Sequence, residues 1–343
     1  MATQVASDQA ASAGAGNPRR IGAVNRSMHQ VGCRRAVPVE PVPSCRWRRL
    51  KMNTLLLHNP AAGASHPTRD DLITAVRKAG LSTTYQSIKD EDFKATLAEN
   101  WDLVLVAGGD GTVAKVARCL IDRNIAHRIP ITVLPVGTAN NIARSLGIEG
   151  EVGGLLSGLS NAKTRYLDVG LARGPWGERN FLEAVGCGSI AEAIAHSGPK
   201  PPKPIRIEMG REALRDFLRE AEAEPFEVDV DGEKFAGEFL LIEALNISLS
   251  GPALPLAFSA TPDDQLLDII FLFARDRRTM MKWLDGNPEE KPPPATVLRG
   301  RKIQFMWDSA FLRIDDRVYL PPKKPSIVEV ELEKERLMIL VPS

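Results

Sequence analysis

The sequence has little that could cross-link a fold through sulfur or metal. Its 343 residues contain four cysteines and five histidines, and neither type shows paired or metal-binding spacing. This excludes a disulfide framework and a structural zinc module. Because Cys119 and Cys187 stand in apolar surroundings, we expect buried thiols and a reducing, cytoplasmic compartment.

Long apolar runs are also missing. None approaches the roughly 20 residues that span a bilayer, so we expect no transmembrane segment and only peripheral contact with a membrane. The pattern G-x-x-x-x-G-K-[ST] does not occur, which excludes the common lysine-bearing phosphate loop. No segment resembles a nucleic-acid-binding module, so we expect no nucleic-acid partner.

The net charge of +1 conceals an uneven distribution. Residues 1–51 hold eight arginines and Lys51 against Asp8 and Glu40, so the rest of the chain is net acidic. This segment lacks periodicity and is predicted not to pack. Three interpretations remain: a targeting peptide, a basic arm for anionic surfaces, or an extension that is not translated. We favour the last, because Met52 opens what reads as a complete first strand, and we exclude residues 1–51 from the fold.

The most informative stretch joins a buried strand to a helix. Leu103–Ala107 is an uninterrupted apolar run, typical of a strand inside a parallel sheet, and helical spacing follows over Val113–Ile121. Three glycines within Gly108–Gly111 let the backbone turn and let a ligand approach the amides at the helix start, where a phosphate is favoured. The carboxylate of Asp110 repels a phosphate unless it holds a cation or a proton, which indicates phosphoryl chemistry. The alternative is a turn in which Asp110 only caps the helix.

A second junction of the same kind follows. Ile129–Leu134 reads as a strand, and Gly137–Thr138 is predicted to begin a helix that carries Ile142 and Leu146. Strands and helices also alternate upstream, over Thr54–His58, Pro67–Gly80, Leu81–Ser87 and Asp90–Asn100. This alternation predicts a parallel sheet, and ligands of such sheets bind at the carboxyl ends of the strands.

The pattern changes after a predicted helix at Val152–Leu159. Strand-like segments separated by turns follow at Arg165–Ala172, Asn180–Val185, Phe226–Val230, Phe235–Ser248, Leu266–Phe273, Lys302–Met306, Phe311–Ile314, Val328–Leu332 and Met338–Val341. Asp231-Gly232 predicts a hairpin, and one helix is predicted at Arg211–Ala223. Many strands with few helices predict a second, mostly antiparallel domain.

Three motifs together resemble the diacylglycerol kinase catalytic domain family, the bacterial lipid kinases within a sphingosine kinase-like superfamily. They are Asn-Pro-x-x-Gly at Asn59–Gly63, GGDGT at Gly108–Thr112 and P-x-GT-x-N at Pro135–Asn140. GGDGT alone is shared with NAD kinases. The resemblance runs from about Met52 to the C-terminus. It implies an NAD kinase/diacylglycerol kinase-like α/β fold, with a parallel nucleotide-binding domain at residues 52–162, joined by residues 326–343, and an antiparallel β-sandwich lipid-substrate domain at residues 163–325.

The resemblance also implies an ATP site. Its residues come from the glycine-rich turns and the neighbouring strand ends, namely Asn59, Gly63, Ser87, Gly108, Gly109, Asp110, Gly111, Thr112, Gly137, Thr138 and Asn140. Asn141 replaces the aspartate that is more usual in this motif, which loses a charge but keeps a polar cap.

A magnesium ion is implied near a second acidic turn. Ala260–Asp268 resembles the family pattern A-x-x-x-D-G-x-L-D, in which the aspartate anchors the ion with nearby backbone carbonyls. Carried over, Asp264 is the anchor, and Thr261 and Leu266 lend carbonyl oxygens. Such a sparse set suits magnesium, which keeps several waters. Gln265 stands where the family has glycine, so a positive φ there would be strained. The alternative is an Asp-rich surface turn.

The glutamate that the family uses as its catalytic base is replaced by arginine in this chain. The family carries D-G-E in a β-hairpin, and its glutamate is taken to receive the proton of the lipid hydroxyl. Here Asp315-Asp316-Arg317 puts an arginine at that place, and a guanidinium cannot act as a base. Asp315 or Asp316 would serve after a shift in register, and Asp110 is another candidate.

The resemblance therefore implies an ATP- and Mg²⁺-dependent lipid kinase that phosphorylates the hydroxyl of diacylglycerol or a related lipid. We expect it to be cytoplasmic and peripheral to the membrane, and a homodimer is left open. One alternative is a nucleotide-binding sensor or scaffold with weak catalysis, which Arg317 favours. A less favoured one is NAD kinase, because Ile247 follows Asn246 where that family has an Asn-Glu pair.

Overall fold

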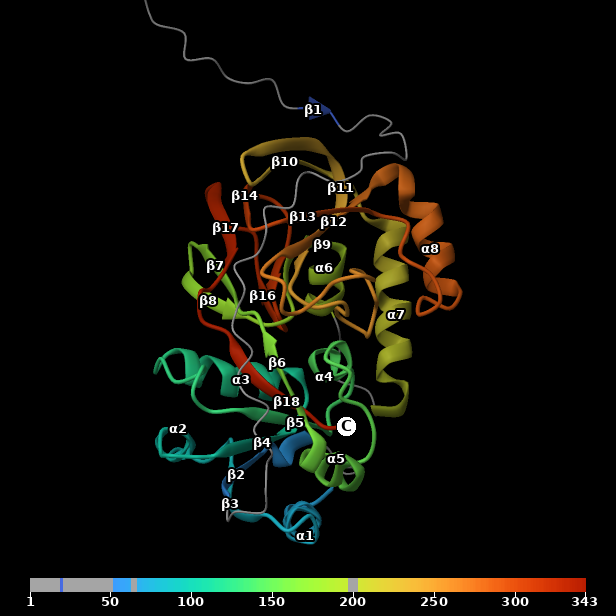
Figure 1. Cartoon of the computed structure of the whole chain (residues 1–343). Coiled ribbons are helices and arrows are strands. Elements are labelled where there is room, and N and C mark those ends of the chain that lie inside the picture. Colours follow the sequence, from blue (N-terminus) through green and yellow to red (C-terminus); the bar gives the residue numbers. More distant parts are fainter. Residues whose placement is uncertain (1–18, 21–51, 63–66, 197–202) are drawn as a thin grey trace, which may run out of the picture.

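The computed structural model describes residues 19–20, 52–62, 67–196 and 203–343. The chain forms two stacked halves, one around a six-stranded sheet and the other around a twelve-stranded sheet (Figure 1). The first sheet is mostly parallel and the second mostly antiparallel, which confirms the predicted fold class. Of residues 1–51, only Arg19–Arg20 (β1) is described, so the interpretations of that segment lie outside the described residues.

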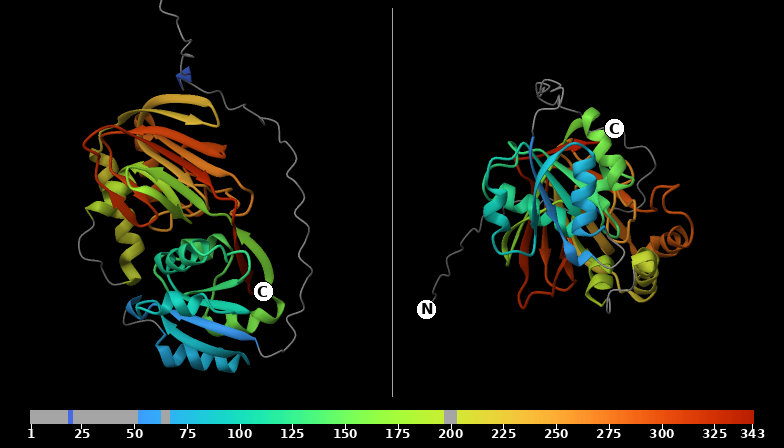
Figure 2. Two further views of the ribbon diagram at one scale, coloured as in Figure 1. Left: turned by 90° about the vertical axis from the view of Figure 1, so that its left-hand side faces the viewer. Right: turned by 90° about the horizontal axis from the view of Figure 1, so that it is seen from below.

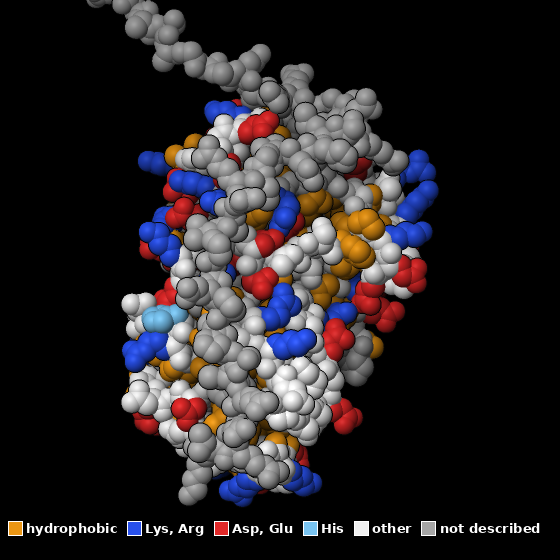
Figure 3. Space-filling view, in the orientation of Figure 1, with side chains coloured by type: hydrophobic (Ala, Val, Ile, Leu, Met, Phe, Trp, Pro, Cys, Tyr) orange, Lys and Arg blue, Asp and Glu red, His pale blue; other side chains and the backbone are white. Residues whose placement is uncertain are grey.

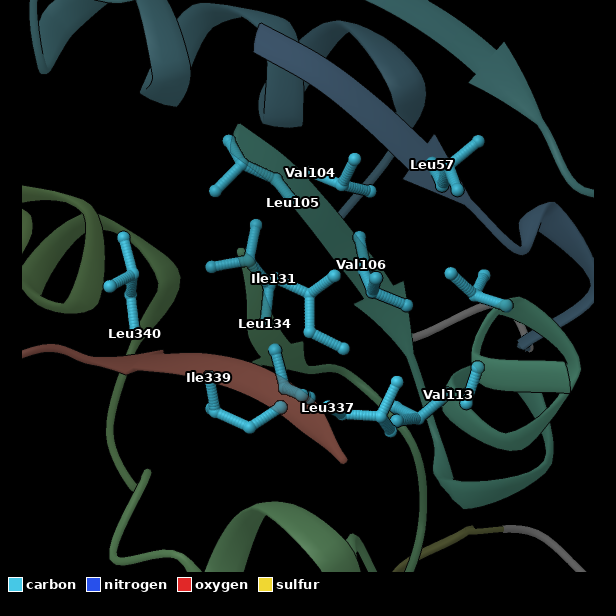
Figure 4. Packing of buried hydrophobic residues seen from close by; sticks show 14 of the residues in the cluster. Leu57, Val104, Leu105, Val106, Val113, Ile131, Leu134, Leu337, Ile339 and Leu340 are labelled. Carbon is cyan, nitrogen blue, oxygen red and sulfur yellow. The ribbon is translucent and has the colours of Figure 1, made fainter. Parts of the chain in front are cut away.

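The six-stranded sheet has the order β3-β2-β4-β5-β18-β6. Its strands are β2 (Asn53–His58), β3 (Ser82–Ser87), β4 (Leu103–Gly108), β5 (Ile131–Pro135), β6 (Lys163–Leu167) and β18 (Leu337–Val341). Neighbours pair in parallel except for β6, which runs antiparallel to β18 at the edge. Every residue of β4 is buried, as its uninterrupted apolar run predicts. Figure 4 shows side chains of β4, β5 and β18 meeting in one core.

Short helices cover this sheet. They are α1 (Arg69–Lys78), α2 (Phe93–Leu97), α3 (Asp110–Ile121), α4 (Asn141–Ser145) and α5 (Val152–Gly158), with single turns η1 (Pro60–Ala62) and η2 (Leu159–Asn161). The start of α1 is a capping box, in which the Asp71 N–H donates to the Thr68 hydroxyl and the Thr68 N–H donates to the Asp71 carboxylate. The helices α1, α2 and α3 are the crossovers from β2 to β3, from β3 to β4 and from β4 to β5. The turns that follow β4 and β5 lie at one edge of the sheet.

The twelve-stranded sheet contains the path β16-β15-β9-β11-β10-β14-β17-β7-β8. Its strands are β1, β7 (Gly170–Gly174), β8 (Gly177–Phe181), β9 (Ala184–Gly188), β10 (Glu224–Val230), β11 (Glu233–Leu245), β12 (Leu267–Phe273), β13 (Thr296–Gly300), β14 (Lys302–Trp307), β15 (Leu312–Ile314), β16 (Arg317–Tyr319) and β17 (Ser326–Leu332). The predicted hairpin joins β10 to β11, and both turn residues, Asp231 and Gly232, have positive φ.

The long strand β11 makes this sheet fold back on itself. Its first half pairs with β10, its second half pairs with β9 and β12, and the register shifts between Phe239 and Leu241. Aromatic side chains such as Phe271 and Trp307 fill the core that this fold encloses. On the outside lie α6 (Ser189–Ala195), α7 (Lys203–Glu220) and α8 (Arg277–Asp285), over a separate apolar cluster (Figure 2). The single turn η3 (Ala274–Asp276) precedes α8.

The chain passes between the halves at two places, and both differ from the predicted boundaries. The predicted strand Arg165–Ala172 is broken at Asp168, so that β6 lies in the first sheet and β7 in the second. Likewise β17 belongs to the second sheet, and of residues 326–343 only β18 joins the first. The two crossings are bonded to each other, since the Glu333 N–H donates to the Val169 carbonyl at 2.7 Å. The domain division itself remains a prediction.

In the described part of the chain, no helix is long and apolar enough to cross a membrane. Over the face drawn in Figure 3, acidic and basic side chains are interspersed.

Candidate functional site

The two glycine turns that follow β4 and β5 touch each other through their backbones. A Cβ built on Gly137 would lie 2.3 Å from the Cα of Gly109, and one built on Gly109 would lie 2.9 Å from the Cα of Gly137. Only glycine fits at either position, because both obstacles are backbone. The structure thus brings GGDGT and P-x-GT-x-N to one place at the carboxyl ends of adjacent strands.

The first motif also reaches this place. The amide of Asn59 donates to the Thr112 hydroxyl at 3.1 Å, which links the end of β2 to the first turn of α3. A Cβ on Gly108 would lie 2.5 Å from the side chain of Thr112, so this turn is closely packed as well. Ser87 is buried at the end of β3, where its hydroxyl accepts the Lys89 N–H. Gly63 lies outside the described residues.

One predicted helix start is wrong. We expected a helix from Gly137–Thr138, but α4 begins at Asn141, because Asn140 adopts a left-handed conformation with φ 51°. Its side-chain oxygen accepts the Gly137 N–H at 2.9 Å and so closes the turn. Asn tolerates this conformation better than most residues. Asn140 therefore shapes the loop around Gly137.

Asp110 lies at the first position of α3. Its Oδ1 accepts the Ile142 N–H at 2.9 Å, so the carboxylate connects the two glycine turns. Burial raises the pKa of this carboxyl to about 7, and the negative charge of Glu183 adds to the effect. A carboxyl that titrates near neutral pH can either hold or accept a proton, which is what a general base or acid requires.

The acidic hairpin lies against the same helix start. Strands β15 and β16 pair Ile314 with Arg317, so Asp315 and Asp316 form the turn. The Oδ2 of Asp316 would lie 3.3 Å from a Cβ on Gly111, and Asp316 is exposed. The guanidinium of Arg317 stacks on Tyr319, 5.0 Å from the ring centroid. Among the three residues of this motif, Asp316 is the one whose carboxylate faces the glycine turn.

Asp315 has different surroundings. It is buried, and its Oδ1 accepts the N–H groups of Leu182 at 3.1 Å and Glu183 at 2.9 Å. Arg118 of α3 approaches its other oxygen at 3.5 Å. Burial raises the pKa of Asp315 to about 6. Its carboxylate is committed to holding the link between β8 and β9, which makes it unsuited to meeting a substrate.

A cation reaches the second glycine turn from the other half of the molecule. The guanidinium of Arg206 donates to the Thr138 hydroxyl at 3.0 Å. The sequence predicted a helix only from Arg211, but α7 begins at Lys203 and so includes Arg206. Proline in the first turn of a helix, as at Pro204, is the signal that marks this start.

Sequence reasoning missed a buried ionic cluster in the second half of the molecule. Arg313 of β15 is 1% exposed and donates to Glu243 at 2.9 and 2.7 Å, to Glu183 at 3.1 Å and to the Ser250 hydroxyl. Glu243 lies on β11 and Glu183 in the link before β9. Such an arrangement leaves few signals in one sequence, apart from charged residues inside otherwise apolar strands.

The predicted metal residues lie apart from the glycine turns, in the loop before β12. The Oδ1 of Asp264 accepts the Leu266 N–H at 3.0 Å, and its Oδ2 pairs with Arg299. Gln265 has φ 60°, the strained left-handed conformation that its replacement of glycine implied. No group of three or more His, Cys, Asp or Glu side chains within the described residues is placed to hold a metal.

Asp168, which the sequence did not single out, lies beside this loop. Its Oδ2 accepts the Gln265 N–H at 2.6 Å, whereas its Oδ1 is buried, has no hydrogen bond from any described residue and lies 3.9 Å from the Nε of Arg336. Burial raises the pKa of Asp168 to about 6, because it outweighs the opposing effects of the Gln265 N–H and the Arg336 guanidinium. A cation at this oxygen would therefore compete with Arg336. A metal ion on Asp264 would have to displace Arg299.

Comparison with known proteins agrees with this geometry. Residues 53–172 match the diacylglycerol kinase catalytic domain family. Diacylglycerol kinases from Staphylococcus aureus strains RF122 / ET3-1 and MRSA252 are each 26% identical to this chain over 203 residues, which cover 56% of the chain and 61% of the relative. The match therefore spans about three fifths of these relatives.

Solved structures are similar over a longer part of the chain. The crystal structure of a diacylglycerol kinase from Bacillus anthracis str. Sterne covers 85% of this chain and 97% of its own, with a TM-score of 0.66 and 19% identity. At that identity the likeness concerns the fold alone. The chain has the NAD kinase/diacylglycerol kinase-like fold of these structures. Within it, residues 53–172 are the part that matches the diacylglycerol kinase catalytic domain family.

Proposed function

We propose that this protein is a lipid kinase that transfers the γ-phosphoryl group of ATP to the hydroxyl of diacylglycerol or a related lipid. One observation carries the proposal: three polar groups converge on the touching glycine turns at Gly109 and Gly137. They are the carboxylate of Asp110, the exposed carboxylate of Asp316 and the guanidinium of Arg206. The match of residues 53–172 to the diacylglycerol kinase catalytic domain family supports ATP as the donor.

The nucleotide phosphates would lie over the start of α3. The positive end of the helix dipole at the start of α3 favours an anion there. Thr138 and Arg206 would hold the phosphates from the opposite side. The lipid hydroxyl would approach from the second half, where Asp316 or Asp110 receives its proton as the new P–O bond forms and ADP leaves. Phosphoryl transfer depends mainly on such positioning and charge.

Magnesium has two places in this proposal. One ion accompanies ATP and neutralises its phosphates. A second, structural ion would lie on Asp264 with the carbonyls of Thr261 and Leu266, close to the Oδ1 of Asp168, which has no hydrogen bond from a described residue and lies 3.9 Å from Arg336. It would hold the loop before β12 next to Asp168, where the chain passes from the first half to the second. Arg299 competes with this ion for the Asp264 carboxylate.

A transfer assay tests the proposal. The protein, γ-labelled ATP and magnesium are incubated with mixed micelles of diacylglycerol, and an organic-soluble labelled product is expected. Asp110→Ala is expected to abolish transfer. Near-normal transfer rates in that variant would contradict the assignment as a lipid kinase. Because the lipid lies in a membrane, we also propose that the protein acts at the membrane surface, which sedimentation with vesicles checks.

Arg317 favours a second candidate, a nucleotide-binding sensor with little catalysis. It occupies the position where the family has its glutamate base, and its guanidinium stacks on Tyr319. Tight ATP binding without transfer to diacylglycerol or to a total lipid extract would support this candidate. Labelled NAD in the same assay tests the less favoured NAD kinase.

A further inference from the structure

One buried carboxylate joins the two halves of the molecule. Glu183 lies in the two-residue link between β8 and β9 and is 7% exposed. Its Oε2 accepts the side-chain N–H of Asn141, at the start of α4, at 2.9 Å. Its Oε1 accepts the Gly251 N–H at 2.8 Å, and Asn141 also donates to the Gly251 carbonyl at 3.0 Å. This closed set of bonds connects the P-x-GT-x-N turn to the second half.

Glu183 lies among groups of both signs. Arg313 on β15 donates to it, Glu243 on β11 shares that guanidinium, and Asp315 in the hairpin turn accepts its backbone N–H. From the first half, Asp110 on α3 accepts the N–H of Ile142, the residue next to the Asn141 that bonds Glu183, so the two carboxylates meet at the start of α4. Arg118 of the same helix pairs with Asp315. Carboxylates therefore outnumber guanidinium groups, and this buried excess of negative charge favours the protonated form of Asp110.

We propose that Glu183 is a positioning residue, which fixes the P-x-GT-x-N turn through Asn141 and whose negative charge sets the ionisation of Asp110. Its effect on turnover rests on the proposed function, but its effect on Asp110 does not. In that function, the hydroxyl O–H bond breaks, its proton passes to the carboxylate of Asp110 or Asp316, the new P–O bond forms and ADP takes the electrons of the bond that breaks. Glu183 exchanges no atom with either substrate.

The geometry explains why Asn141 suits this contact. Its amide donates to a carboxylate, whereas an aspartate there would put two carboxylates within 3 Å of each other, because the present donor and acceptor lie 2.9 Å apart. The Oδ1 of Asn141 is buried and has no hydrogen bond within the described chain. In E183Q, rotation of the Asn141 side-chain amide would turn its Oδ1 toward the new amide group at position 183. The variant can therefore keep a hydrogen bond between the two halves.

Carboxyl NMR of the full chain labelled with ¹³C-aspartate tests the proposal without any turnover. The Asp110 signal is assigned by its loss in D110N. We expect a titration midpoint near neutral pH in the native protein, a fall on the order of one pH unit in E183Q, and a rise in N141D, which adds a negative charge beside Asp110. E178Q, an exposed carboxylate paired with Arg173, is the matched control and should leave the midpoint unchanged.

A structural role alone would lower the melting temperature of E183Q without moving the Asp110 midpoint, and that result would overturn the proposal. If E183Q does not fold, an unmoved midpoint in N141D overturns it equally. If the native protein transfers phosphate, the pH at which kcat/KM falls on the acid side should shift in each variant, in the same direction as the NMR midpoint of Asp110. If no transfer occurs in the native protein, the proposed function fails while the NMR result still decides the role of Glu183.

Discussion

Gly109 and Gly137 lie so close that a Cβ on Gly137 would come within 2.3 Å of the other Cα. The approach joins two motifs that are separated by the whole of α3 and β5. We predict that Gly137→Ala abolishes ATP binding, because the added carbon meets backbone that cannot move away without opening the site. Isothermal titration with ATP and magnesium measures this.

Gly153→Ala is the control for that substitution. Gly153 lies in α5, where a Cβ would meet no described atom within 4 Å, and alanine is favoured over glycine in a helix by roughly 1 kcal/mol. This variant should bind ATP normally and be equally or more stable. Loss of ATP binding in both variants would contradict the explanation by close approach.

The two aspartates of the hairpin turn should behave differently. Asp316 is exposed and faces Gly111, so Asp316→Asn should lower kcat by about 10²- to 10⁴-fold, the usual contribution of a general base, at little cost in stability. Unchanged kcat in this variant would leave Asp110 as the base.

Asp315 should instead carry a pH-dependent stability. Its folded pKa of about 6 exceeds the 3.8 of the unfolded chain, so between these values the folded state binds more protons. Relative to Asp315→Asn, the native protein should therefore lose stability as pH rises from about 4 to about 6, by at most roughly 3 kcal/mol. Urea unfolding of both proteins across this range measures the difference. A difference that stays constant with pH would refute this explanation.

Arg313 should be essential for the stability of the second half. It is 1% exposed and bonded to Glu183 and Glu243, and Arg313→Met would leave both carboxylates buried without their partner. We expect a loss of about 3–5 kcal/mol in the free energy of unfolding, from urea titration. Arg219→Met removes a solvent-exposed pair with Asp216 and should change stability by less than about 1 kcal/mol. Equal effects of the two substitutions would contradict the role given to the buried cluster.

Magnesium should raise the melting temperature of the protein by binding in the loop before β12. The effect is expected to disappear in Asp264→Asn, which removes the anchor. It should appear at lower magnesium concentration in Arg299→Ala, which removes the competing guanidinium. A stabilisation by magnesium that survives Asp264→Asn would place the ion elsewhere.

The sequence predicted the parts of the fold that depend on local pattern. The apolar run of β4 and the glycine motifs predicted the parallel strands at the centre of the first sheet and the glycine turns that follow β4 and β5. It could not predict that Asp168 interrupts a continuous strand-like segment, because the break arises where the chain passes from one sheet to the other.

The part of the site that was missed depends on contacts between distant segments. Glu183, Glu243 and Arg313 come from the β8–β9 link, β11 and β15, and no spacing in the sequence brings them together. The choice among Asp315, Asp316 and Arg317 likewise needed the hairpin register, which pairs Ile314 with Arg317 and turns Asp316 toward Gly111. A one-residue change of register reverses the direction of a side chain.

The most direct test of the account is transfer of label from γ-labelled ATP, with magnesium, to lipid in mixed micelles containing diacylglycerol. We predict an organic-soluble labelled product whose mass identifies the phosphorylated lipid, and its loss in Asp110→Ala. Tight binding of ATP with no label in diacylglycerol or in any component of a total lipid extract would contradict the lipid kinase assignment.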